Sequence, residues 1–470
     1  MNIRLITILI FLVPIFLSAQ EKTFSLEDCI EYALENATDV KNAILDEELA
    51  EAQIKETIGI GLPQISGTVV AQKSPTLQRF YGQWSPNSSI GPNADQAQQL
   101  GIEEGDVYAA ENFFQLQSAG DASLSINQLI FNGSYIVGLQ ASRVFKELSV
   151  NQKEETAGQR KADVAKAYFN VLVNEDRLKL FAGNLARLDT LYRNTVELNK
   201  NGFAEEIEVD RLKVSLNNLK SEEDNLKNLN ILSMRLLKFQ MNYPINQPLK
   251  LSGKIEDVLS RSIVGVTDEV VYNDRADYRV LIENKKLQEL NLKNKYAEAL
   301  PTIGAFANLG YSTQSPDFTG LFSTRSDFSE AGGVGPDGWY KYSSIGLRLN
   351  WSIFTGLQRN YQIQQQKIEL KKIDNSLQEF ESLIEVQVKE AELTFTNAMQ
   401  KFEVQKENAE LAEKIFRISQ TKYEEGVGSN LEVVEADSAL KDAQANYFNA
   451  LFEAIVAKID LNRALGREEE

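Results

Sequence analysis

The longest regular pattern in this sequence is a spacing of apolar residues by steps of three and four. It occurs in two tracts, residues 164–192 and 384–423. The members are Val164, Tyr168, Val171, Leu178, Phe181, Leu185, Leu188 and Tyr192 in the first tract, and Ile384, Val388, Ala391, Phe395, Ala398, Phe402, Ala409, Ala412, Phe416 and Tyr423 in the second. Such a heptad spacing is typical of α-helices packed as in coiled coils.

Proline placement determines how far these helices are able to extend. No proline occurs between Gly133 and Tyr243 or after Pro336, and a proline inside a helix costs roughly 3 kcal/mol. A helix over residues 357–423 would be about 100 Å long at 1.5 Å per residue. The sequence therefore predicts very long helices and disfavours the alternative of ordinary amphipathic helices in a compact bundle.

Each of the two tracts is interrupted by glycine and then resumes its apolar pattern. Gly202 interrupts the first tract and Gly426 the second. Glycine commonly ends a helix by adopting the left-handed conformation. The sequence thus predicts two helical hairpins, over residues 133–242 and 356–465.

Four shorter segments alternate between apolar and polar side chains, as strands do, and each is about ten residues long, the length of a tilted membrane strand. They are residues 64–73, 119–131, 301–313 and 342–355. Phe306 is the exception on an otherwise small or polar face. A half-buried sheet of a soluble protein would show the same alternation. We expect the strands to pair as two hairpins whose connections, 74–119 and 314–341, are polar loops.

Aromatic residues lie near the ends of these segments. They are Phe131, Tyr311, Trp339, Tyr340, Tyr342, Trp351 and Phe354. Rings at strand ends suit the interfacial girdle of a membrane protein, and edge aromatics are also common in soluble strands. We single out Phe131, Tyr311, Trp351 and Phe354 as a candidate girdle.

The two halves of the chain repeat each other. Leu62-Pro63 and Ile65 recur as Leu300-Pro301 and Ile303, and the order of later matches, up to Leu216 with Leu440, is the same in both halves. Self-similarity of this kind indicates one structural unit used twice. We predict a first repeat over 21–242 and a second over 243–470, the second beginning with a connecting segment, 243–300.

The N-terminus resembles a secretory signal peptide. Arg4 precedes an apolar run over residues 5–17, and small or polar residues follow at 18–20. We expect cleavage near residue 20, with no lipid anchor because no cysteine follows the cut. No later stretch is apolar enough for a membrane helix, so entry into a membrane would need a closed sheet.

Composition excludes several classes of function. The net charge of −18 argues against a nucleic-acid partner, and the absence of histidine removes histidine-based catalysis and metal sites. The single cysteine, Cys29, is expected to be a buried apolar residue. The sequence contains no phosphate loop or nucleophile–base pair, so we expect neither an enzyme, nor a cofactor, nor a metal site.

The strand count bears on assembly. Four strands cannot close a barrel, for which about eight is the practical minimum. Two copies would give a filled eight-stranded barrel, whereas three copies would give twelve strands and a usable lumen. The sequence thus favours a homotrimer.

Several segments together resemble the TolC family of outer-membrane channel-tunnels. They are residues 24–36, the repeated Leu-Pro-x-Ile strand starts, the Phe-x-Gly strand ends and the segment 423–437. The resemblance implies a mixed α and β fold, in which long helical hairpins form a trimeric α-barrel continuous with a 12-stranded membrane β-barrel. It also implies an equatorial layer, a location in the outer membrane extending into the periplasm, a periplasmic adaptor, and an inner-membrane pump of RND or ABC type.

The resemblance extends to the tip of the second hairpin. Tyr423, Glu432 and Glu435 match the family positions at the closed periplasmic entrance, where paired acidic residues form a ring. Two glutamates three apart share one helix face. The alternative is a solvated helix start, where acidic residues are favoured anyway. TolC has an arginine where this chain has Gly428, which puts in doubt the contact made by that side chain.

The hairpin tips are the contact zone for the adaptor that the resemblance implies. Their residues are Gly202, Phe203, Gly426, Val427 and Gly428. The predicted function is a passive exit duct of a tripartite efflux or type I secretion system, gated at its periplasmic tip. The alternative is a structural or adhesive coiled-coil surface protein, which would not explain the strands or the duplication.

Overall fold

A computed structural model describes residues 23–112, 114–253, 255, 271–323 and 338–467. Contacts divide the chain into two compact units, one of residues up to 50 with 144–286 and 371 onward, the other of residues 51–143 and 287–370. Each sequence repeat contributes to both units, so the repeats are not separate compact bodies. The expected signal peptide, 1–20, lies outside the described residues.

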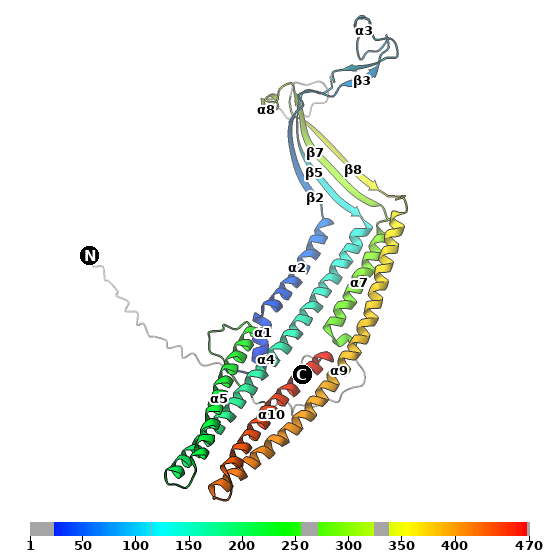
Figure 1. Cartoon of the computed structure of the whole chain (residues 1–470). Helices are drawn as coiled ribbons and strands as arrows, with labels where there is room; N and C mark the ends of the chain where they lie inside the picture. The colour runs from blue at the N-terminus through cyan, green and yellow to red at the C-terminus, as the bar shows by residue number, and fades with distance from the viewer. Residues whose placement is uncertain (1–22, 113, 254, 256–270, 324–337, 468–470) are drawn as a thin grey trace, which may run out of the picture. The chain divides into compact units, whose positions relative to one another are not determined.

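Two helical hairpins dominate the helical part of the chain (Figure 1). The first consists of α4 (Gly133–Lys200) and α5 (Glu206–Met241), and the second of α9 (Gln358–Glu424) and α10 (Asn430–Ala464). The prediction of very long helices is confirmed, since α4 has 68 residues and α9 has 67. Gly202 and Gly426 have φ of 78° and 75°, the left-handed conformation expected where each hairpin turns.

Local hydrogen bonds fix where other helices begin and end. In the described ranges, the remaining helices of more than one turn are α1 (Leu26–Asn36), α2 (Thr38–Ile60), α3 (Ala94–Leu100) and α7 (Ala276–Ala297), and η1 (Tyr272–Asp274) is a 3-10 turn. Ser25 caps α1, because its hydroxyl accepts from Asp28 N at 3.1 Å while Ser25 N donates to the Asp28 carboxylate at 2.9 Å. Asn242 ends α5 in the left-handed conformation. The N-terminal segment is held further by β1 (Thr23–Phe24), which pairs in parallel with β6 (Lys250–Leu251).

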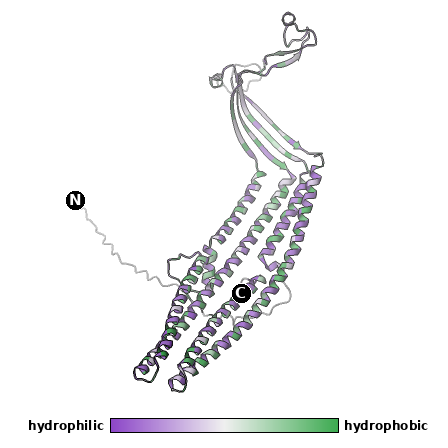
Figure 2. Cartoon of the chain, viewed as in Figure 1, coloured by the Kyte–Doolittle hydropathy of each residue, from purple (hydrophilic) through white to green (hydrophobic). Residues whose placement is uncertain are grey.

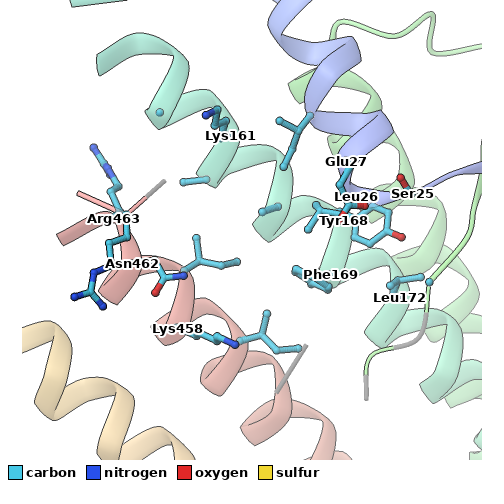
Figure 3. A pocket seen from close by; sticks show the side chains of 18 of the residues that line it. Ser25, Leu26, Glu27, Lys161, Tyr168, Phe169, Leu172, Lys458, Asn462 and Arg463 are labelled. Atoms are coloured by element: carbon cyan, nitrogen blue, oxygen red, sulfur yellow. The ribbon is translucent and has the colours of Figure 1, made fainter. Parts of the chain in front are cut away.

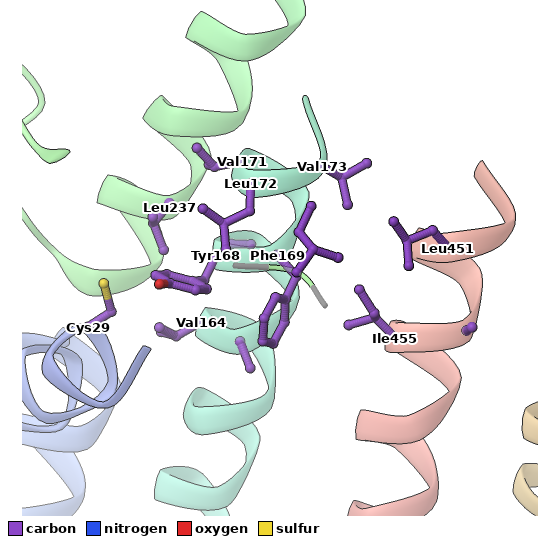
Figure 4. Close-up of a cluster of buried hydrophobic side chains, with 14 of the residues drawn as sticks. Cys29, Val164, Tyr168, Phe169, Val171, Leu172, Val173, Leu237, Leu451 and Ile455 are labelled. Atoms are coloured by element: carbon purple, nitrogen blue, oxygen red, sulfur yellow. The ribbon is translucent and has the colours of Figure 1, made fainter. Parts of the chain in front are cut away.

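One hydrophobic core joins α1 to the middle of the long helices (Figure 4). Tyr168 and Phe169 of α4 pack there with Leu237 of α5 and Ile455 of α10. Cys29 is completely buried in this core, and burial raises the pKa of its thiol to about 12. The prediction that Cys29 is a buried apolar residue is therefore confirmed.

A second core follows the heptad pattern toward the hairpin tips. Phe181 and Leu188 of α4 and Phe416 of α9 are buried there, and Val433 and Leu440 of α10 complete the cluster. These helices bury their apolar stripes against one another, which is why the pattern of threes and fours extends so far along the sequence.

The four predicted strands form one antiparallel sheet in the order β2-β5-β7-β8. Their bounds are β2 (Gln64–Lys73), β5 (Ser118–Phe131), β7 (Thr302–Ser315) and β8 (Tyr340–Asn350). β5 pairs with both β2 and β7, so the central pair joins the two sequence repeats. The expected strand over 342–355 is wrong at its C-terminal end, because β8 stops at Asn350 and the chain turns through Gly356 and Leu357 at positive φ.

One face of this sheet carries apolar side chains that the chain itself leaves uncovered. Ile345, Leu347 and Val69 are 87%, 75% and 81% exposed. The alternation of apolar and polar residues along the strands is visible in Figure 2. An apolar face of this size needs a nonaqueous or protein environment to cover it.

The connections between strands hold more structure than their composition suggested. The segment expected to be a polar loop over 74–119 contains α3 and an antiparallel pair, β3 (Phe80–Gln83) and β4 (Val107–Ala110). Trp84 and Tyr108 form a small core with Ala97, and the Trp84 indole donates to Pro92 O at 2.7 Å. The described part of 314–341 contains the short helix α8 (Gly320–Ser323).

Among the described residues, no helix combines the length and the apolar character that crossing a membrane would require.

Candidate functional site

The residues predicted to form the entrance and the adaptor contact lie at the tips of the two helical hairpins. Each tip is a tight turn between two long helices, and the chain reverses at Gly202 in the first and at Gly426 in the second. Phe203 N donates to Leu198 O at 2.9 Å and Val427 N donates to Lys422 O at 2.9 Å, which satisfies the last carbonyls of α4 and α9. The two turns therefore have the same hydrogen-bonding plan.

A polar contact links the two hairpins just behind their tips. The Tyr423 hydroxyl donates to Glu208 Oε2 at 2.9 Å and lies 3.2 Å from Thr195 Oγ1. Tyr423 belongs to α9, whereas Thr195 and Glu208 belong to α4 and α5. Burial raises the pKa of the Tyr423 hydroxyl, so that it remains protonated and able to donate at neutral pH.

Sequence reasoning identified Tyr423 but not its partners. A signal was present, because Glu208 in the first repeat occupies the position that Glu432 has in the second. The two glutamates differ in environment: Glu208 is half-buried against Tyr423, and Glu432 is exposed. The repeats have thus diverged at their tips, and the polar contact joins one repeat to the other.

Glu432 and Glu435 both lie exposed at the start of α10, while Val433 and Ala436 between and beside them are buried. Glu432 N donates to the capping hydroxyl of Ser429 at 3.2 Å. The structure therefore places the two carboxylates on one solvent-facing side of the first turns. That arrangement fits both a charged ring in an assembly and a solvated helix start, so the role of these glutamates stays a prediction.

Gly428 has a steric reason for being glycine. A Cβ at this position would lie 2.8 Å from Lys422 Cβ and 3.1 Å from Tyr423 N. Gly428 N donates to Lys422 O at 2.9 Å, which draws the two segments together. A side chain such as the arginine found in TolC would not fit this turn, and the link between hairpins is made here through Tyr423.

Each tip also presents an apolar side chain to solvent. Phe203 is 81% exposed and Val427 is 78% exposed. A shallow cavity of about 340 Å³ adjoins the second tip, lined by Ile418, Lys422 and Val427 among others. Both side chains are accessible to another protein, and whether one binds there stays a prediction.

The candidate aromatic girdle residues fall at both ends of the sheet. Phe131 is the last residue of β5, and Tyr311 lies toward the other end of the sheet, opposite Lys341. Trp351 and Phe354 lie beyond the end of β8, where the Trp351 indole donates to Ala299 O at 3.1 Å. Trp351 was expected within the strand, and the structure corrects this. Whether the four rings contact lipid stays a prediction.

A cavity of about 340 Å³ lies beside α1, between α4 and α10 (Figure 3). Its lining combines apolar residues with one carboxylate, Glu27, and four cationic side chains, which are Lys161, Lys458, Arg463 and Arg467. This lining does not by itself define a ligand.

Groups of three or more residues able to hold a metal ion do not occur within the described ranges.

A family model, that of outer membrane efflux proteins, matches residues 278–467. Among curated proteins the chain is 22% identical over 448 residues to the toluene efflux pump outer membrane protein TtgC of Pseudomonas putida. That alignment covers 94% of this chain and 83% of the relative. The antibiotic efflux pump outer membrane protein ArpC of Pseudomonas putida matches with the same identity and coverage.

Solved structures show the same fold. The CusC structure superposes with a TM-score of 0.71 at 15% identity, covering 94% of this chain and 91% of that one. The open state of the Neisseria gonorrhoeae MtrE outer membrane channel gives 0.68 at 16% identity, with 94% and 88% covered. The Campylobacter jejuni CmeC outer membrane channel gives 0.65 at 16% identity, with 95% and 87% covered.

Proposed function

We propose that the chain is a member of the family of outer membrane efflux proteins, whose family model matches residues 278–467, and that three copies form a passive exit duct in the outer membrane, extending into the periplasm. The duct would serve a tripartite efflux or type I secretion system. It would perform no catalysis, and the energy would come from an inner-membrane pump of RND or ABC type.

The observation that carries this proposal is the four-stranded sheet with an exposed apolar face. Its edge strands are β2 and β8, and in the described chain neither has a second neighbour. Lipid would cover the apolar face but would not satisfy the backbone groups of the edges. Pairing β2 of one copy with β8 of the next satisfies them, and three copies of four strands close a sheet of twelve.

The hairpin tips support the periplasmic half of the proposal. Phe203 and Val427 are exposed apolar groups on adjacent turns of equivalent design. We propose that both tips contact a periplasmic adaptor protein, with Gly202, Gly426 and Gly428 providing the turns that present these side chains.

The entrance would lie at the same tips. In a trimer the exposed pair Glu432 and Glu435 would supply 2 × 3 = 6 carboxylates around the axis. The bond from Tyr423 to Glu208 would hold the two hairpins of each protomer together in the closed state. The aromatic residues Phe131, Tyr311, Trp351 and Phe354 would lie at the two lipid interfaces.

The assembly is tested by light scattering of the detergent-purified protein. The proposal requires a homotrimer, whereas a monomer or a dimer would contradict it. A coiled-coil surface fibre would account for α4 and α9 but leaves the apolar face of the sheet unexplained.

A further inference from the structure

Phe306 is an aromatic residue on the polar face of the sheet, where it breaks the alternation expected from the sequence. The structure shows what the ring does. The Arg348 guanidinium lies over the Phe306 ring, 5.2 Å from its centroid. A guanidinium stacked on an aromatic face is held in one orientation by a cation–π interaction.

A glycine lies opposite each member of this pair, and one of them makes room for the ring. Phe306 lies opposite Gly346 and Arg348 lies opposite Gly304 in the ladder between β7 and β8. A Cβ at Gly346 would come within 2.9 Å of Phe306 Cζ, so the ring lies across the position that a side chain would fill. Phe306 and Arg348 thus lie diagonally across the two strands, with the guanidinium over the ring.

The pair lies in a cavity of about 520 Å³ at the junction of the strands with α2 and α4. The other polar groups that line it are amides and hydroxyls, namely Thr57, Gln64, Asn127, Gln128, Asn132, Ser134, Tyr135, Thr302 and Asn350. Of the described residues lining this cavity, Arg348 is the single charged one.

Arg348 makes no ion pair with any carboxylate in the described part of the chain, and its guanidinium donors remain available on an exposed side chain. Several of the lining amides and hydroxyls already donate within the chain, as Gln128 Nε2 does to Gly61 O and the Tyr135 hydroxyl to Ile58 O. The guanidinium of Arg348 is therefore the principal donor facing the cavity, and no carboxylate lines the cavity to compete with an anion. A guanidinium binds a small oxyanion through two parallel hydrogen bonds.

We propose that this cavity binds small oxyanions, carboxylate or phosphate groups, either free or on a larger solute. Arg348 is the binding residue, and Phe306 positions it. The location of this site in a lumen rests on the duct proposed above. In that duct, three copies would form a ring of guanidinium groups at the membrane end. This ring of guanidinium groups would be opposite in sign to the acidic tips.

Calorimetric titration of the detergent-purified whole protein tests the site without relying on conduction. The two probes are inorganic phosphate and succinate. Comparing their affinities distinguishes a site for phosphate from a site for carboxylate. We expect at least one probe to bind, and Arg348→Gln to weaken its binding at least about tenfold. Lys73→Gln is the matched control. Lys73 lies in the same sheet but on the opposite face, the one that carries the apolar side chains. This substitution should leave the affinity for the probe unchanged.

Two further variants separate positioning from charge. Phe306→Leu keeps the positive charge and should weaken binding about threefold by releasing the guanidinium, while Arg348→Lys should retain part of the affinity. Absence of binding by the parent, or equal binding by the parent and Arg348→Gln, would overturn the proposal. Binding by a protein that forms no channel would instead refute the proposed function and leave this site standing.

Discussion

The Tyr423 hydroxyl donates a hydrogen bond of 2.9 Å to Glu208, joining the last turn of α9 to the first turn of α5. It is a contact between two sequence repeats that each fold as a hairpin. Because its two partners come from different hairpins, separating the hairpins requires breaking it.

Tyr423→Phe should therefore favour separation of the tips. Loss of a hydrogen bond to a carboxylate costs about 1 kcal/mol on a partly exposed surface, a shift of roughly fivefold in the population of separated tips. We expect a higher conductance of the resting protein in a planar bilayer. Tyr192→Phe, in the same hydrophobic cluster, should behave as the parent. Equal conductance of Tyr423→Phe and the parent would show that this bond does not hold the tips.

The exposed pair Glu432 and Glu435 should bind multivalent cations if three copies bring them together. A trivalent cation added on the periplasmic side should block the current, because crowded carboxylates are stabilised by a bridging cation. Replacing both with Gln should remove the block without changing the assembly, since neither side chain is part of a buried core.

The matched control for this pair is Glu407 with Glu410, which have the same spacing and are exposed on α9. Their replacement by Gln should leave the block intact. If the variant lacking Glu432 and Glu435 is blocked as strongly as the parent, these residues do not bind the blocking cation. They would then be solvated acidic residues at the start of a helix.

Gly428→Ala should loosen the second tip. The added Cβ would meet Lys422 Cβ at 2.8 Å, and forcing an atom into such a space costs about 1–3 kcal/mol. Hydrogen exchange of the amides in the turn should become faster. Gly183→Ala is the control, because nothing lies within 4 Å of its position in α4, and it should not accelerate exchange at the tip. Unchanged protection in Gly428→Ala would refute the steric reason for this glycine.

Cys29 should react slowly with alkylating reagents in the folded protein. Its thiol is buried and its pKa is raised from 9.0 to about 12, so the reactive thiolate stays scarce as the pH rises through 9. The alkylation rate of the folded chain should therefore show no half-point near pH 9, whereas that of the unfolded chain should. The measurement is mass spectrometry of the modified cysteine as a function of pH, and a folded-state rate that titrates near 9 would contradict the buried position.

Much of the fold followed from the sequence because its elements are long and periodic. The seam from Val164 to Tyr192 and the turns at Gly202 and Gly426 were predictable from spacing and from the left-handed conformation that glycine adopts. The C-terminal end of β8 was not predictable from the sequence. Trp351 continues the apolar alternation of the strand, but in the structure it lies beyond the strand and its indole donates a hydrogen bond to Ala299 O.

The sites were less predictable than the fold, since they depend on contacts between distant segments. Tyr423 was identified through the resemblance to the TolC family, but Thr195 and Glu208 are its partners only because two hairpins lie together. Phe306 was visible only as an irregularity. Its role depends on Arg348 and Gly346 in the neighbouring strand, and pairing register is not encoded in either strand alone.

The central claim is that three copies of this chain form a duct through a membrane. The most direct test is the current through a planar bilayer to which the purified trimer is added. The account predicts discrete, uniform conductance steps that increase in number with the amount of trimer. A trimer that inserts into the bilayer without producing any conductance step would contradict it.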